Sequence, residues 1–148
     1  MGLVQCAVLV LCITTTGLAA DIAPTRFIAP NGMTVLVLEQ HFLPIVEIHA
    51  LIKAGAAQDP PEKAGVANLV ASLLDEGTTT RSSRQLAEQI DFVGGSLAVQ
   101  AGEDYTTASA RTLKKDIDLG VTRMADIHQH AAFPKQEFER VRSQILGE

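Results

Sequence analysis

Apolar and polar side chains alternate along this chain with two different periods, which divide it into strands and helices. Residues 26–29 and 33–39 alternate with a period of two, and they flank Asn31-Gly32, a dipeptide typical of tight hairpin turns. Residues 45–54 alternate in the same way and predict a third strand. The chain from residue 26 to residue 54 is therefore expected to form a small β-sheet.

A helical period predominates after the double proline at positions 60 and 61. The spacing predicts a helix from about Glu62 to Leu74 that Gly77 closes, and Ser82 with Gln85 predicts a capping box for a second helix. Two strands and two helices are expected to follow, at residues 96–100, 105–111, 113 to about 131, and 134–147. The order βββααββαα indicates an α+β domain, with mostly antiparallel strands and helices packed on one face of the sheet.

The first twenty residues carry no charged side chain and contain an apolar run from Leu3 to Ile13. This run is too short to span a bilayer, and small residues follow it at positions 17, 19 and 20. Residues 1–20 are therefore predicted to be a signal peptide, which implies export to the periplasm or out of the cell. No Lys or Arg precedes the run, so an uncleaved membrane anchor is the alternative. Both cysteines, Cys6 and Cys12, lie in this segment, and the mature chain would lack thiols.

Composition narrows the class of protein further. The 148 residues are 47% apolar and 20% charged, which suits one globular domain with a hydrophobic core. Twelve basic residues against 17 acidic ones give a net charge of −5. A chain with this charge and no long Lys/Arg cluster is not expected to bind nucleic acid.

One face of the helix predicted after the double proline is apolar. At about 100° per residue, its large apolar side chains fall within one arc that is expected to pack on the sheet. These residues are Val66, Leu69, Val70, Leu73 and Leu74. The opposite, outward face is expected to carry Asn68, Ala71, Ser72 and Asp75.

Residues 65–78 resemble the H-x-x-E-H helix of the pitrilysin/insulinase family of zinc peptidases, in which two histidines flank a carboxylate base. The three motif positions are Asn68, Ala71 and Ser72 in this sequence. The resemblance runs in ordered segments from residue 26 to residue 148. It takes in the strand 48–55 with its proline loop, the exit 75–78, the segment 94–97, the helix around 139–142, and Glu148.

The resemblance implies a processing-peptidase-like metallohydrolase domain, namely the N-terminal part of such a domain over residues 26–148, incomplete at its C-terminus. It also implies zinc in active relatives and places Glu148 at the third, distant ligand position. A catalytic zinc needs about three protein ligands, and the neutral oxygens of Asn68 and Ser72 are poor substitutes for imidazole. Ala71 has no group that could take a proton from water. No cofactor is therefore expected, and the chain is predicted not to hydrolyse peptides by the family's mechanism.

In this family inactive halves pair with active ones, so the chain is expected to be a non-catalytic partner that helps to bind peptide substrate. Its own partner would be an active peptidase homologue or a C-terminal half of the same family. Three alternatives stay open: an active zinc peptidase with ligands from elsewhere, an unrelated extracytoplasmic binding module, and an inactive fragment. Asn68→His, Ala71→Glu and Ser72→His together are expected to create zinc affinity through Glu148.

Other residues with chemical potential have simpler explanations. The histidines lack the i, i+4 pairing of a helical metal site and are expected to pack or cap. Hydroxyl groups at residues 78–83 are explained by a loop and a helix cap, and Asp75-Glu76 by solvated charge at a helix end. No glycine-rich phosphate loop follows a strand. The four histidines are His41, His49, His128 and His130.

Overall fold

The computed structural model describes residues 23–147 in two compact units, which divide after His41. The signal peptide predicted for residues 1–20 and the ligand position Glu148 both lie outside this range. In the first unit, β1 (Thr25–Ile28) and β2 (Thr34–Val37) form an antiparallel hairpin. Gly32 in its turn has a φ of +84°, which confirms the hairpin predicted from the Asn-Gly pair.

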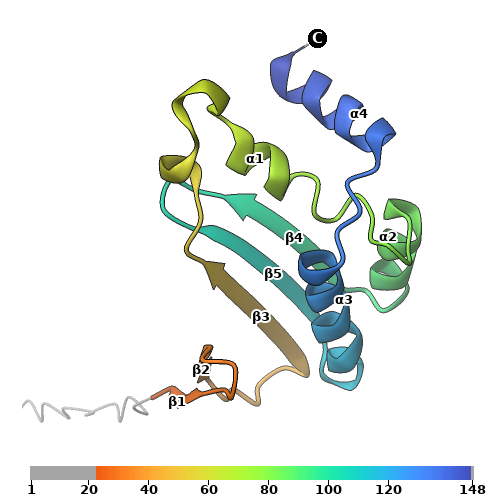
Figure 1. Ribbon diagram of the computed structural model, residues 1–148. Helices are drawn as coiled ribbons and strands as arrows, with labels where there is room; N and C mark the ends of the chain where they lie inside the picture. The colour runs from red at the N-terminus through yellow and green to blue at the C-terminus, as the bar shows by residue number, and fades with distance from the viewer. Residues whose placement is uncertain (1–22, 148) are drawn as a thin grey trace, which may run out of the picture. The chain divides into compact units, whose positions relative to one another are not determined.

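The second unit is built on a three-stranded antiparallel sheet with the order β3-β5-β4 (Figure 1). Its strands are β3 (Ile45–Ile52), β4 (Ser96–Ala101) and β5 (Thr106–Leu113). The expectation that β3 joins the two opening strands in one sheet is wrong. β3 pairs along its whole length with β5, which follows it by more than fifty residues, and a period of two cannot reveal such a distant partner.

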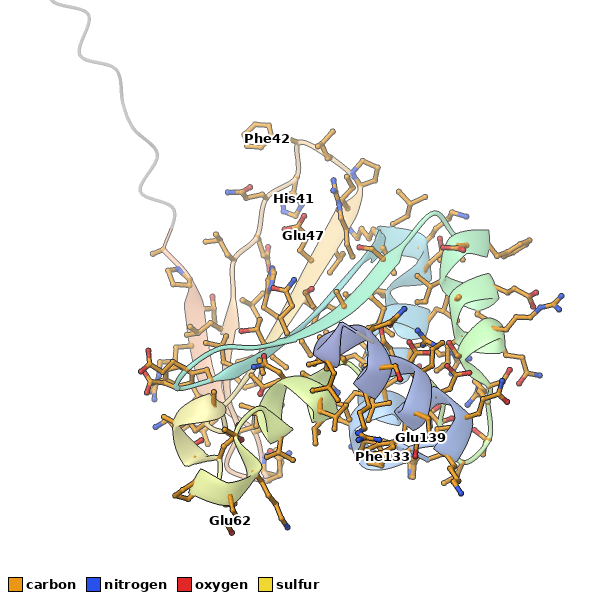
Figure 2. The ribbon with its side chains drawn as sticks, turned by 90° about the horizontal axis from the view of Figure 1, so that it is seen from above. His41, Phe42, Glu47, Glu62, Phe133 and Glu139 are labelled. Carbon is orange, nitrogen blue, oxygen red and sulfur yellow. The ribbon has the colours of Figure 1, made fainter. Side chains whose placement is uncertain are left out.

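Helices pack on the face of the sheet that carries its apolar side chains. They are α1 (Val66–Ala71), α2 (Ser83–Phe92), α3 (Ile117–Gln129) and α4 (Lys135–Leu146), with short 3-10 turns at Ala56–Gln58, Pro61–Lys63 and Lys114–Asp116. Ala108 and Ala110 of β5 are buried against Met124 of α3. Glycine at 120 lets α3 approach β5, since a Cβ there would lie 3.0 Å from the Thr112 side chain. In Figure 2, Glu47 lies on the side of the sheet away from α4 and its Glu139.

Local sequence signals explain the start of α2 and the end of α4. Ser82 and Gln85 form the predicted capping box at the start of α2: the Gln85 backbone N–H donates to Ser82 Oγ at 3.3 Å, and the Ser82 N–H donates to Gln85 Oε1 at 2.9 Å. Gly147, with a φ of +71°, ends α4. Among residues 23–147, no helix combines the length and apolar character needed to cross a bilayer.

The helix predicted from Glu62 to Leu74 is much shorter than expected. Gly65 interrupts it with a φ of +95°, and only Val66–Ala71 is α-helical. The Asp59 carboxylate accepts hydrogen bonds from the backbone N–H groups of Gly65 (2.8 Å) and Ala67 (3.0 Å). These two hydrogen bonds satisfy backbone amide groups at the start of α1, so Asp59 helps to determine the residue at which the helix begins.

Candidate functional site

The candidate site lies where α1 ends. The backbone N–H of Ser72 donates to the carbonyl oxygen of Asn68 at 3.0 Å, so these two residues stand one helical turn apart on one face. Both are exposed. The positions at which the resemblance places two histidines therefore keep the spacing and the exposure that a helical metal pair needs.

The exposure of Ala71, the motif position between Asn68 and Ser72, differs from the prediction made from the helical pattern. Ala71 is only 3% exposed, although it was expected on the outward face. Val70, which was expected to pack on the sheet, is 40% exposed. α1 contacts both β4 and α4, so a helix of six residues is covered on two sides and its buried arc shifts toward residue 71. A helical wheel that assumes a single buried face does not anticipate this.

A pocket of about 330 Å³ opens beside Ser72. We call it the Ser72 pocket; the segment that follows α1, the strand β4 and the last turns of α4 form its walls. The last turn of α4 contributes Gln144 and Ile145, which lie a few residues before Glu148 in the sequence. The full lining is Ser72, Asp75, Glu76, Val99, Val141, Gln144 and Ile145. A neighbouring pocket of about 280 Å³, bordered by α2 and β4, shares Asp75 and Glu76 with it.

Asp75 and Glu76 are not the solvated pair expected at a helix end. Burial raises the pKa of the Asp75 carboxyl, and the Glu76 carboxylate beside it adds to the rise, while Arg140 opposes it. Glu76 has a side chain that is 20% exposed and forms an ion pair with Arg140 of α4. It also accepts a hydrogen bond from Ser83 Oγ at 3.0 Å. Arg140 lies 64 residues from Glu76, so a local pattern could not reveal this ion pair.

Asp75→Asn is expected to raise the free energy of unfolding at pH 7 by up to about 1 kcal/mol, since the amide resembles the protonated carboxyl and the site is partly solvated. With a raised folded-state pKa, the parent has its full stability below the unfolded pKa and loses it as the pH rises through the folded pKa. In urea unfolding, the variant should therefore have the same free energy of unfolding as the parent below about pH 4, and its full gain over the parent at neutral pH. Asp104→Asn, in an exposed turn, is the control. Equal stability of parent and Asp75→Asn at pH 7 would contradict the prediction.

A second polar cluster, centred on Asp126 of α3, was not expected from the sequence. Its carboxylate accepts hydrogen bonds from Thr78 Oγ1 (3.2 Å) and Arg81 Nη1 (2.8 Å), and it lies 3.1 Å from Nδ1 of His130. Burial would raise the pKa of Asp126, but the hydrogen bonds from Thr78, Arg81 and His130 outweigh it and lower the pKa. The cluster joins the segment after Gly77 to the end of α3.

The remaining histidines are spread over the described residues. His41 and His49 lie near Glu39 (3.6 Å) and Glu47 (4.0 Å), and His128 Nδ1 lies 2.7 Å from the carbonyl oxygen of Met124. Over residues 23–147, no three His, Cys, Asp or Glu side chains come together in a group that could hold a metal ion. The Ser72 pocket, which adjoins one of the two exposed motif positions, is taken as the candidate binding site.

Comparison with known proteins assigns the chain to a family. Residues 34–148 match the model of the insulinase family (peptidase family M16), and the chain belongs to this family. An uncharacterized zinc protease of Rickettsia felis is 31% identical over 118 residues, which cover 80% of this chain and 29% of that protein. A probable mitochondrial-processing peptidase subunit beta of Arabidopsis thaliana is 29% identical over 119 residues, or 80% of this chain and 22% of the relative.

Solved structures confirm the α+β fold. The crystal structure of a peptidase M16 inactive domain from Pseudomonas fluorescens superimposes with a TM-score of 0.79 at 25% identity, over 84% of this chain and 30% of that one. A protease from Helicobacter pylori shares the fold, with a TM-score of 0.76 at 18% identity and the same coverage. The chain spans less than a third of the length of these relatives.

Proposed function

We propose that this chain is a non-catalytic member of the insulinase family, and that it serves as a partner or substrate-binding half for an active family member. The observation that carries the proposal is the chemistry of the motif positions. Asn68 and Ser72 keep the one-turn spacing and the exposure of a ligand pair but offer neutral oxygens, and the position of the general base is a buried alanine. This donor set does not fit a catalytic zinc, which is held by imidazole, thiolate or carboxylate groups.

The partner that the proposal implies is an active peptidase homologue or the C-terminal half of a family member, and the shared ligand is a peptide. The similarity to a peptidase M16 domain described as inactive supports this choice over an unrelated binding module. The Ser72 pocket would contribute a peptide-contacting wall made of Val99, Val141 and Ile145 beside polar side chains. The proposal also includes export, on the basis of the apolar segment before residue 20.

The test is isolation of the full chain from its native extracytoplasmic extract, with mass spectrometry of whatever co-elutes in size exclusion. We expect a homologue with an intact H-x-x-E-H motif. Metal analysis of the separated components is expected to find about one zinc per homologue and none retained by this chain. Elution of the chain alone would favour an inactive fragment or an independent module. Stoichiometric zinc in the chain itself, with peptide hydrolysis, would overturn the proposal.

A further inference from the structure

One carboxylate connects the segment after α1 to the start of α2 and to α4. Glu76 lies after α1; its Oε2 accepts from Ser83, the first residue of α2, and its Oε1 accepts from Nη2 of Arg140 in α4. With most of its side chain removed from solvent, the carboxylate is screened less than a surface group would be. The segment after α1 is thereby joined to two helices through side-chain contacts.

Arg140 is held in one orientation by partners on its own helix. Its Nε donates to Glu137 Oε2 at 2.7 Å and its Nη1 donates to Gln144 Oε1 at 3.0 Å, while Nη2 reaches Glu76. The planar guanidinium presents donors in a rigid fork, so contacts on several sides restrict both its position and its angle. Hydrogen bonds to Glu137 and Glu76 raise the pKa of Arg140, which stays charged.

The Glu76–Arg140 pair stands at the edge of the Ser72 pocket. Glu76 lines the pocket on the side of α1, and Gln144, a partner of Arg140, lines it on the side of α4. Val141, next to Arg140, is buried and lines the same pocket. The distance between the segment after α1 and α4 therefore sets the width of this pocket, and the ion pair spans that distance.

We propose that Glu76 and Arg140 are positioning residues: their ion pair holds α4 against the segment after α1 and so sets the width of the Ser72 pocket. The inference rests on the proposed function, because it concerns the pocket that is proposed there to contact peptide.

The test measures the separation of the two elements in the full chain. Cys6→Ser and Cys12→Ser remove the native thiols. Asn68→Cys in α1 and Gln136→Cys in α4, both at exposed positions, then carry the spin labels. We expect a narrow distance distribution in the parent and one about twofold broader in Arg140→Gln, since the loosened helix samples several positions. Arg140→Lys keeps the positive charge but lacks the planar guanidinium, so the width of its distance distribution should be intermediate between those of the parent and Arg140→Gln. Arg142→Gln is the matched control, because Arg142 pairs with Glu139 of the same helix.

A distribution in Arg140→Gln as narrow as that of the control would overturn the proposal. Circular dichroism and hydrogen exchange of β3, β4 and β5 report whether each variant is folded. If Arg140→Gln does not fold, Glu76→Gln takes its place, with the same expected broadening. If both variants fail to fold while Arg142→Gln folds normally, the ion pair is required for the fold as a whole. That result would also overturn the proposal that the pair positions α4. Partner recovery and zinc content do not enter this test, so its failure is distinguishable from failure of the proposed function.

Discussion

Ala71→Glu is expected to lower the free energy of unfolding by about 3 kcal/mol or more, because the new carboxylate would be placed at a buried position without a partner. The side chain at 71 is buried in α1, which packs against β4 and α4, and a charge buried there would lose its hydration. Urea unfolding followed by circular dichroism measures the change. Burial of position 71 thus opposes a charged side chain there.

Val70→Glu is the matched control, since it adds the same side chain to an exposed position of the same short helix. We expect it to change the free energy of unfolding by less than about 1 kcal/mol. Equal effects of the two substitutions would show that position 71 is open in solution. That result would restore the original expectation that position 71 faces outward.

Asn68→His combined with Ser72→His is expected to create a zinc site with at least about tenfold higher affinity than the unchanged chain, since two imidazoles one turn apart can share a metal ion. Calorimetric titration measures the affinity, and a zinc-dependent rise in Tm reports the same binding by linkage. Asn68→His with Val70→His is the control, because side chains two residues apart on a helix do not face each other. Similar zinc affinity in both variants would contradict the prediction.

Glu148→Gln in the two-histidine background tests the third ligand position. If Glu148 contributes, this change should weaken zinc binding, whereas Glu139→Gln on the exposed side of α4 should not. Addition of Ala71→Glu, which completes the triple substitution expected from the sequence to restore zinc affinity, is now expected to lower metal-free stability. The free energy of zinc binding would have to exceed the free-energy cost of burying the carboxylate introduced at position 71.

Local signals predicted the elements well. The Asn-Gly turn between β1 and β2 and the capping box of α2 depend on contacts within a few residues, so the sequence alone could identify them. The predictions failed where contacts from outside an element decide: Asp59 fixes the start of α1, and β5 rather than β2 pairs with β3. Glu76 likewise has its main partner 64 residues away, and no periodicity encodes that contact.

The order of strands and helices and the membership of the family follow from the sequence alone, because period and motif are local properties of the chain. The tertiary structure alone decided that the outer two motif positions remain exposed while the middle one is buried. It also decided that an ion pair joins the two sides of the Ser72 pocket. Burial and charge pairing depend on which elements pack beside a residue, and these elements can be distant in the sequence. In this protein, β4 and α4 pack against α1 and determine both properties.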